Sequence, residues 1–213
     1  MAKLVSSFKN MALSLTCIAL VAAGALAGVY MLTMAPIEAA MKAKQEAAIM
    51  QVLPEVEGLQ VADAEDVNGI TLYKAYVGEE WVGTAVEATT EGNVNMPFGG
   101  TFRLMVGFDN VGNVVNYVVL EQAETPGLGA LMTTWFKNAD KPGQNILGKT
   151  PATTEFSVSK DGGDIDAITA STITSRAFLE VVVKAYNGIA QQPMPLEAVS
   201  GATQLTTEEG GQQ

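Results

Sequence analysis

Apolar residues dominate the start of the chain and then recur in shorter, patterned runs. No charged residue occurs between Asn10 and Ile37, and the stretch from Met11 to Met34 is almost wholly apolar. A helix of this length rises about 1.5 Å per residue and can cross the roughly 30 Å hydrocarbon layer of a bilayer. The pattern predicts a transmembrane helix within residues 1–35.

The charges around this run predict its orientation. Lys3 and Lys9 precede it without an acidic residue between them, so the positive-inside rule places the N-terminus in the cytoplasm. The domain that follows is then expected on the periplasmic or extracellular side of the plasma membrane. A cleaved signal peptide ending at residues 25–27 is the alternative, but the apolar run continues through residues 29–32. We therefore expect a single-pass protein that keeps its helix in the lipid bilayer.

Residues 36–58 are expected to connect this helix to a domain. The stretch from Pro36 to Leu53 is rich in Ala, Met, Glu, Lys and Gln, which favour helix. Pro54 and Gly58 follow it and are expected to end the helix. This segment is therefore predicted to be a helix that connects the membrane anchor to the domain.

Short β-branched and aromatic runs after residue 58 predict strands. Residues 69–77 and 81–89 are two such runs, separated by a polar turn. The clearest strand covers residues 101–108, where large apolar side chains alternate with smaller or polar ones. Residues 114–121 return as its hairpin partner. The other elements expected are a short helix at residues 131–138 and a strand at residues 155–160.

A hydroxyl-rich run, residues 166–175, leads directly into an amphipathic helix. The apolar positions of that helix recur at spacings of three and four: Phe178, Val181, Val182, Ala185 and Ile189. Thr172 is therefore expected at the helix entrance, where unpaired N–H groups and the helix dipole favour a phosphate. Threonine and serine also serve as N-caps. The local chemistry leaves both roles open for Thr172.

Composition limits the class of protein. With 213 residues and 48% apolar content, the chain can form one membrane anchor and one domain with a core, here residues 59–190, followed by a flexible tail at residues 191–213. The pattern predicts an α+β domain with an antiparallel sheet packed against helices. A net charge of −11 argues against nucleic acid as a partner. Because the chain has no histidine and its one cysteine, Cys17, lies in the apolar helix, we expect neither catalytic residues nor a metal site.

Residues 166–172, Asp-Ala-Ile-Thr-Ala-Ser-Thr, resemble the flavinylation motif Asp-x-x-(Ser/Thr)-Gly-Ala-Thr. In that motif a flavin transferase joins FMN through a phosphoester to the last threonine. The resemblance implies that Thr172 carries covalent FMN and that the transferase recognises Asp166 and Thr169. The neighbouring residues that it implies at the cofactor are Ser171, Ile173 and Thr174.

The match to this motif is not complete. Ala170 replaces Gly and Ser171 replaces Ala, both exchanges between small residues. A second candidate, Ser-Gly-Ala-Thr at residues 200–203, spells the core of the motif more closely. It has Glu197 where Asp is expected, and no apolar helix follows Thr203. We therefore expect FMN on Thr172.

A second motif, Glu-Thr-Pro-Gly-Leu-Gly, occupies residues 124–129. It resembles a signature of the FMN-binding domain shared by the G subunit of the Rnf complex and the C subunit of the sodium-translocating NADH:quinone oxidoreductase. The residues that this resemblance implies at the cofactor are Glu124, Thr125, Gly127, Leu128 and Gly129. Pro126 fixes one φ angle while the two glycines permit close approach of the backbone.

Two further glycines, Gly99 and Gly100, precede the clearest strand, as a Gly-Gly pair does in the resembled domain. They are expected either to let the backbone approach the flavin or to form a plain turn.

The two motifs and the anchor make the chain similar to the Rnf G subunit over nearly its whole length. The resemblance implies an electron-transfer subunit with covalent FMN in a membrane ferredoxin:NAD oxidoreductase that couples electron flow to ion translocation. The implied partners are the other membrane subunits of the Rnf complex, a flavin transferase and the bilayer. The short chain favours this family over the quinone-reductase C subunit. A non-redox structural subunit and an extracytoplasmic flavoprotein that feeds a separate reductase are the other interpretations.

Overall fold

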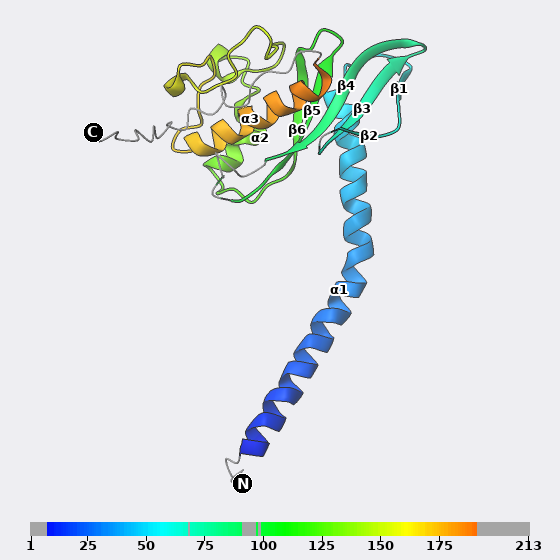
Figure 1. Ribbon diagram of the computed structural model, residues 1–213, viewed down its shortest axis with the longest axis vertical. Helices are drawn as coiled ribbons and strands as arrows, with labels where there is room; N and C mark the ends of the chain where they lie inside the picture. The colour runs from blue at the N-terminus through cyan, green and yellow to red at the C-terminus, as the bar shows by residue number, and fades with distance from the viewer. Residues whose placement is uncertain (1–7, 68, 91–96, 98, 191–213) are drawn as a thin grey trace, which may run out of the picture. The chain divides into compact units, whose positions relative to one another are not determined.

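The computed structural model describes residues 8–67, 69–90, 97 and 99–190, which belong to two compact units. The first unit ends at Lys44 and the second begins at Gln45. The elements in chain order are α1 (Phe8–Val52), β1 (Leu59–Val61), β2 (Glu65–Val67), β3 (Ile70–Val77), β4 (Glu80–Thr89), β5 (Arg103–Asp109), β6 (Val114–Glu121), the 3-10 turn η1 (Gly129–Leu131), α2 (Met132–Trp135), the 3-10 turns η2 (Pro142–Gln144) and η3 (Ser159–Asp161), and α3 (Thr172–Ile189) (Figure 1).

Helix α1 runs from Phe8 to Val52 and passes through Pro36. The segments expected as a transmembrane helix and a connecting helix are therefore parts of one continuous helix. The proline removes one backbone hydrogen bond, but the helix-favouring residues on both sides continue the helix. All side chains from Phe8 to Lys44 are exposed. In the described part of the chain, α1 is the one helix long and apolar enough to cross a membrane.

Within the described residues, six strands form one antiparallel sheet in the order β1-β3-β4-β5-β6, with β2 also paired to β3. The predicted hairpin is confirmed as β5 and β6, in which Val106 lies opposite Tyr117. The turn between them is closed by the Asp109 carboxylate, which accepts the N–H groups of Val111 at 2.9 Å and Asn113 at 2.8 Å. A sheet with helices against it confirms the predicted α+β class.

The alternation predicted for β5 sends side chains to two buried faces of the sheet. Leu104, Val106 and Phe108 enter the main core, which also contains α3. Met105 enters a smaller core on the opposite face, together with the last turn of α1. Gly107 lies against Val52 so closely that any Cβ would overlap the Val52 carbonyl. Both faces of β5 are therefore covered by protein.

Helix α3 packs across β3, β4 and β5 through the apolar stripe that the sequence predicts (Figure 1). Phe178 is the centre of this contact. Its ring stacks on Phe136 with a centroid distance of 4.3 Å and meets Tyr117 edge-on at 4.9 Å. The start of α3, and with it Thr172, is thus fixed by the main core.

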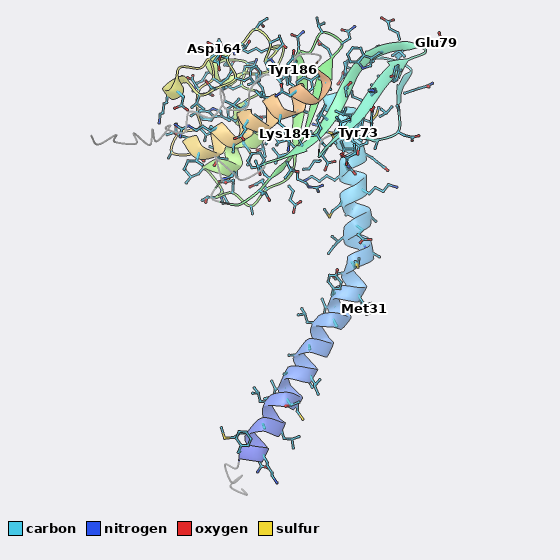
Figure 2. The ribbon with its side chains drawn as sticks, in the orientation of Figure 1. Met31, Tyr73, Glu79, Asp164, Lys184 and Tyr186 are labelled. Atoms are coloured by element: carbon cyan, nitrogen blue, oxygen red, sulfur yellow. The ribbon has the colours of Figure 1, made fainter. Side chains whose placement is uncertain are left out.

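The strand expected at residues 155–160 is wrong. Phe156 and Val158 are buried as the alternation suggests, but the segment forms one isolated bridge, between Val158 and Ile165, and then the turn η3. Asp164, labelled in Figure 2, accepts the N–H of Glu155 at 2.9 Å and so takes the place of a strand partner. The predicted helix at residues 131–138 is also shorter, since it consists of η1 and the four residues of α2.

Candidate functional site

Thr172 is the first residue of α3, so its predicted place at the helix entrance is confirmed. The N-cap position belongs to Ser171, which rules out the N-cap alternative for Thr172. The Ser171 hydroxyl makes no capping bond and instead donates to Oγ1 of Thr174 at 2.9 Å. Ser171 and Thr174 are buried, whereas Thr172 and Ile173 are half-buried.

The hydroxyl of Ser175 fixes the approach to this helix. It accepts the N–H of Ile168 at 2.9 Å and donates to the Ser171 carbonyl at 2.9 Å. The hydroxyls of the run are therefore used to shape the turn, and Ser171 leaves the N–H groups of the first helical turn uncapped by its side chain. Such N–H groups, at the positive end of the dipole, fit an anion.

Lys160 is the cation that reaches this entrance. Its Nζ donates to Oγ1 of Thr172 at 3.4 Å, across twelve residues of sequence. Lys160 belongs to η3, whose next residue, Asp161, accepts from Nε of Arg176 at 2.7 Å and from a second guanidinium nitrogen at 2.8 Å. The hydrogen bonds from Arg176 are the main cause that lowers the pKa of the Asp161 carboxyl.

Asp166, the first residue of the motif, is held by protein on both sides. Its Oδ1 accepts the Ser159 hydroxyl at 2.8 Å, and its carboxylate lies where a side chain on Gly143 would be. Its N–H donates to the Gly143 carbonyl at 2.6 Å, and its own carbonyl accepts the indole N–H of Trp135 at 2.9 Å. These bonds give Asp166 a structural task within the chain. Thr169 is exposed.

Ala170 has a backbone φ of 59°, the one positive φ of a non-glycine residue in the described part of the chain. A side chain in this left-handed region costs roughly 1–2 kcal/mol relative to the right-handed region, whereas glycine enters it freely. The flavinylation motif has glycine at this position. The sequence departure therefore falls where the backbone geometry favours glycine.

The second motif begins with a buried carboxylate. Glu124 is 6% exposed, and its Oε1 accepts the N–H of Gly99 at 3.0 Å. A Cβ on Gly129 would overlap the Glu124 carboxylate, and a Cβ on Gly99 would overlap the carbonyl of Ala123. The small size of Gly99 and Gly129 is thus required by contacts within the protein. This explains both glycines without a cofactor.

The rest of the loop is open to solvent. The carbonyl of Thr125 accepts the N–H groups of Leu128 at 3.1 Å and Ala130 at 3.3 Å, which fixes the turn. Gly127 and Gly100 have φ values of 77° and 82°, with open space beside them. Thr125, Gly127 and Leu128 are exposed, so these members of the motif are the ones free to meet a ligand.

Trp135 connects the two motifs. The loop at residues 124–129 leads into η1 and α2, and α2 ends at Trp135. The indole N–H of Trp135 donates a hydrogen bond to the carbonyl of Asp166. Neither the hydrogen bond between Trp135 and Asp166 nor the contact of Lys160 with Thr172 could be predicted from the spacing of residues in the sequence. Candidate residues at 200–203 lie outside the described residues.

These features fit FMN at two points. The uncapped start of α3 with Lys160 beside it suits a phosphate, and the exposed turn at Leu128 presents backbone and one apolar side chain to a ring. Residues 98–187 match the FMN-binding domain family, and residues 1–52 match the RnfG N-terminal region. The chain is thus an FMN-binding-domain protein with a long apolar N-terminal helix.

Three relatives give the particular family, and all three are G subunits of an ion-translocating oxidoreductase complex. The relative from Methanosarcina acetivorans is 31% identical over 182 residues, which cover 82% of this chain and 90% of the relative. The relative from Escherichia coli K12 is 32% identical, and the match covers 82% of this chain and 86% of the relative. The relative from Haemophilus influenzae strain PittEE is 32% identical, and the match covers 71% of this chain and 75% of the relative. The chain belongs to the G-subunit family of ion-translocating oxidoreductase complexes.

Proposed function

We propose that Thr172 carries FMN through a phosphoester bond. The chain is an FMN-carrying electron-transfer subunit of an ion-translocating oxidoreductase complex, in which it works with the other subunits. The observation that carries the proposal is the position of Thr172. Its hydroxyl stands at the entrance of α3, on the last residue of the flavinylation motif, where Ser171 leaves the helix uncapped.

The ester requires an activated phosphorus, such as the pyrophosphate of a flavin dinucleotide. The bond from Thr172 Oγ1 to the flavin-side phosphorus forms and the pyrophosphate bond breaks. The other mononucleotide leaves, and the threonine hydroxyl loses its proton. No electron is transferred in this step. The flavin transferase that catalyses it is one of the proposed partners, and it can approach because Thr169 and Ala170 are exposed.

When bound, FMN supplies the electron transfer, and the protein orients it. A phosphoester holds FMN at one end only, so a second contact is needed to fix the ring. The exposed members of the second motif, Thr125, Gly127 and Leu128, are the residues proposed for this contact. Buried Glu124 holds their turn in place through Gly99 and Gly129.

The membrane part of the proposal rests on α1. Its apolar stretch from Met11 to Met34 has the length needed to span a bilayer once, and Lys3 and Lys9 favour a cytoplasmic N-terminus. The FMN-binding domain then lies on the periplasmic or extracellular side. There it acts as a redox subunit of a translocase that couples electron flow to ion movement.

The test is covalent flavin in the full-length chain co-expressed with a flavin transferase. Ultraviolet fluorescence of the denatured band is expected in the wild type, in Thr203→Ala and in Thr172→Ser, which keeps a hydroxyl. It is expected to disappear in Thr172→Ala. The reverse pattern for the two alanine variants would place FMN on Thr203. A dark wild-type band would favour the non-redox structural subunit.

A further inference from the structure

The contacts of Lys160 do not show a role for this side chain in stabilising the fold. It is exposed and belongs to the three-residue turn η3, and within the described part of the chain its ammonium donates a hydrogen bond only to the hydroxyl of Thr172, at 3.4 Å. No carboxylate among the described residues forms an ion pair with it. The carboxylate of the adjacent residue, Asp161, is already used by Arg176. A positive charge without a direct ion pair among the described residues therefore lies beside the hydroxyl, although the Asp161 carboxylate is near enough for Lys160 to contribute to lowering the pKa of that carboxyl.

The turn that carries Lys160 is fastened at both ends. On one side, Asp161 binds Arg176 with two hydrogen bonds, and Arg176 lies one helical turn after Thr172 on α3. This bidentate geometry fixes both position and orientation. It holds η3 beside the first turn of the helix.

On the other side, Ser159 fastens η3 to the motif. Its hydroxyl donates to Oδ1 of Asp166 at 2.8 Å, and its N–H donates to the carbonyl of Ile165 at 2.8 Å. Asp166 is itself held by Gly143 and Trp135. One end of η3 is thus attached to Asp166, at the start of the motif, and the other to Arg176, four residues after its last threonine, and Lys160 lies between them.

We propose that Lys160 is the positioning residue for the phosphate of the flavin ester, and that Asp161 and Asp166 hold it at that place. The inference rests on the proposed attachment of FMN to Thr172. A phosphodiester at Oγ1 carries one negative charge, and the ammonium within reach of that oxygen neutralises it together with the N–H groups of α3. The phosphate is then fixed on two sides, so the flavin tether has fewer orientations.

The experiment compares four full-length variants with the wild type, each co-expressed with the transferase. Lys160→Gln removes the charge, and Lys160→Arg keeps it. Asp161→Asn loosens the attachment of η3. The matched control is Lys184→Gln, which removes the same charge from α3 twelve residues after Thr172, about 18 Å along the helix (Figure 2). Intact mass gives the loaded fraction, phosphorus NMR reports on the ester, and fluorescence anisotropy reports on flavin mobility.

In Lys160→Gln we expect attachment to slow by about tenfold, the change that loss of one charge-assisted hydrogen bond produces. The material that does load is expected to have a shifted phosphorus resonance and lower flavin anisotropy. Asp161→Asn should change the same three quantities in the same direction by a smaller amount. Lys160→Arg and Lys184→Gln should resemble the wild type.

Each outcome decides the question. If Lys160→Gln does not load while Lys160→Arg and Lys184→Gln do, the charge is needed and the proposal holds. If neither Lys160 variant loads, or if Lys160→Gln loads at the wild-type rate with an unchanged resonance and anisotropy, the proposal is wrong. A failure of the ester itself is distinct, because the wild type would then lack covalent FMN or carry it on a residue other than Thr172.

Discussion

The carboxylate of Glu124 occupies the space that a side chain on Gly129 would need. The same carboxylate accepts the N–H of Gly99, so one buried acid joins the segment before β5 to the turn at residues 124–129. The turn is therefore supported from inside the protein. Its exposed residues are free for other contacts.

This relationship predicts the effect of a methyl group at position 129. Gly129→Ala should displace the Glu124 carboxylate and break its bond with Gly99, lowering the free energy of unfolding by about 2 kcal/mol. In a Glu124→Ala background the same substitution should cost at least about 1 kcal/mol less, because the clash has been removed. Chemical denaturation of the four proteins measures this coupling. If Gly129→Ala lowered the free energy of unfolding equally in the two backgrounds, the contact with Glu124 would not be what restricts residue 129 to glycine.

A glycine at position 170 is expected to stabilise the protein. Ala170 has a φ of 59°, so Ala170→Gly relieves backbone strain, and we expect the free energy of unfolding to rise by about 1 kcal/mol. Ala177→Gly, in the interior of α3, is the control and should lower it by a similar amount. Thermal unfolding of both variants decides the point. If Ala170→Gly destabilised the protein, the claim that the backbone is strained at Ala170 would be wrong.

The ion pair of Asp161 with Arg176 predicts a dependence on pH. Because the folded pKa of Asp161 lies below its ordinary value of 3.8, the pair stabilises the fold fully above about pH 3.8, and the contribution disappears as the pH falls through the folded pKa. The difference in unfolding midpoint between the wild type and Asp161→Asn should therefore be large at pH 7 and should decrease as the pH falls below 3.8. A difference that is constant over this range would show that protonation of Asp161 is not responsible.

Strong local patterns in the sequence predict much of this fold. The alternation in β5, the partner strand β6 at residues 114–121 and the apolar stripe of α3 all occur where expected. The strand expected at residues 155–160 does not, because an isolated alternating segment can bury Phe156 and Val158 without a neighbouring strand. Tertiary context decides such cases.

The candidate site divides in the same way. Thr172 at the entrance of α3 follows from helical periodicity, which is local. The contacts of Lys160 with Thr172 and of Glu124 with Gly129 depend on side chains that meet only in the folded domain. The sequence could therefore identify candidate residues in the two motifs. It could not show which of these residues are buried and support the site and which are exposed.

The orientation of α1 predicts which side of the membrane carries the domain. With a cytoplasmic N-terminus, the domain should be digested when protease is added to intact cells stripped of any outer membrane. A tag placed before Lys3 should remain protected in the same cells. Protection of the domain and digestion of the tag would reverse the proposed topology.

Peptide mass mapping of the loaded protein tests the central claim most directly. Trypsin cleaves after Lys160, Arg176 and Lys184, so Thr172 falls in the peptide of residues 161–176 and Thr203 in the peptide of residues 185–213. We predict that the first peptide carries the added mass of one FMN less one water, with fragmentation assigning it to Thr172, and that the second peptide is unmodified. FMN on residues 185–213, or an unmodified peptide 161–176 in protein that retains covalent flavin, would contradict the account.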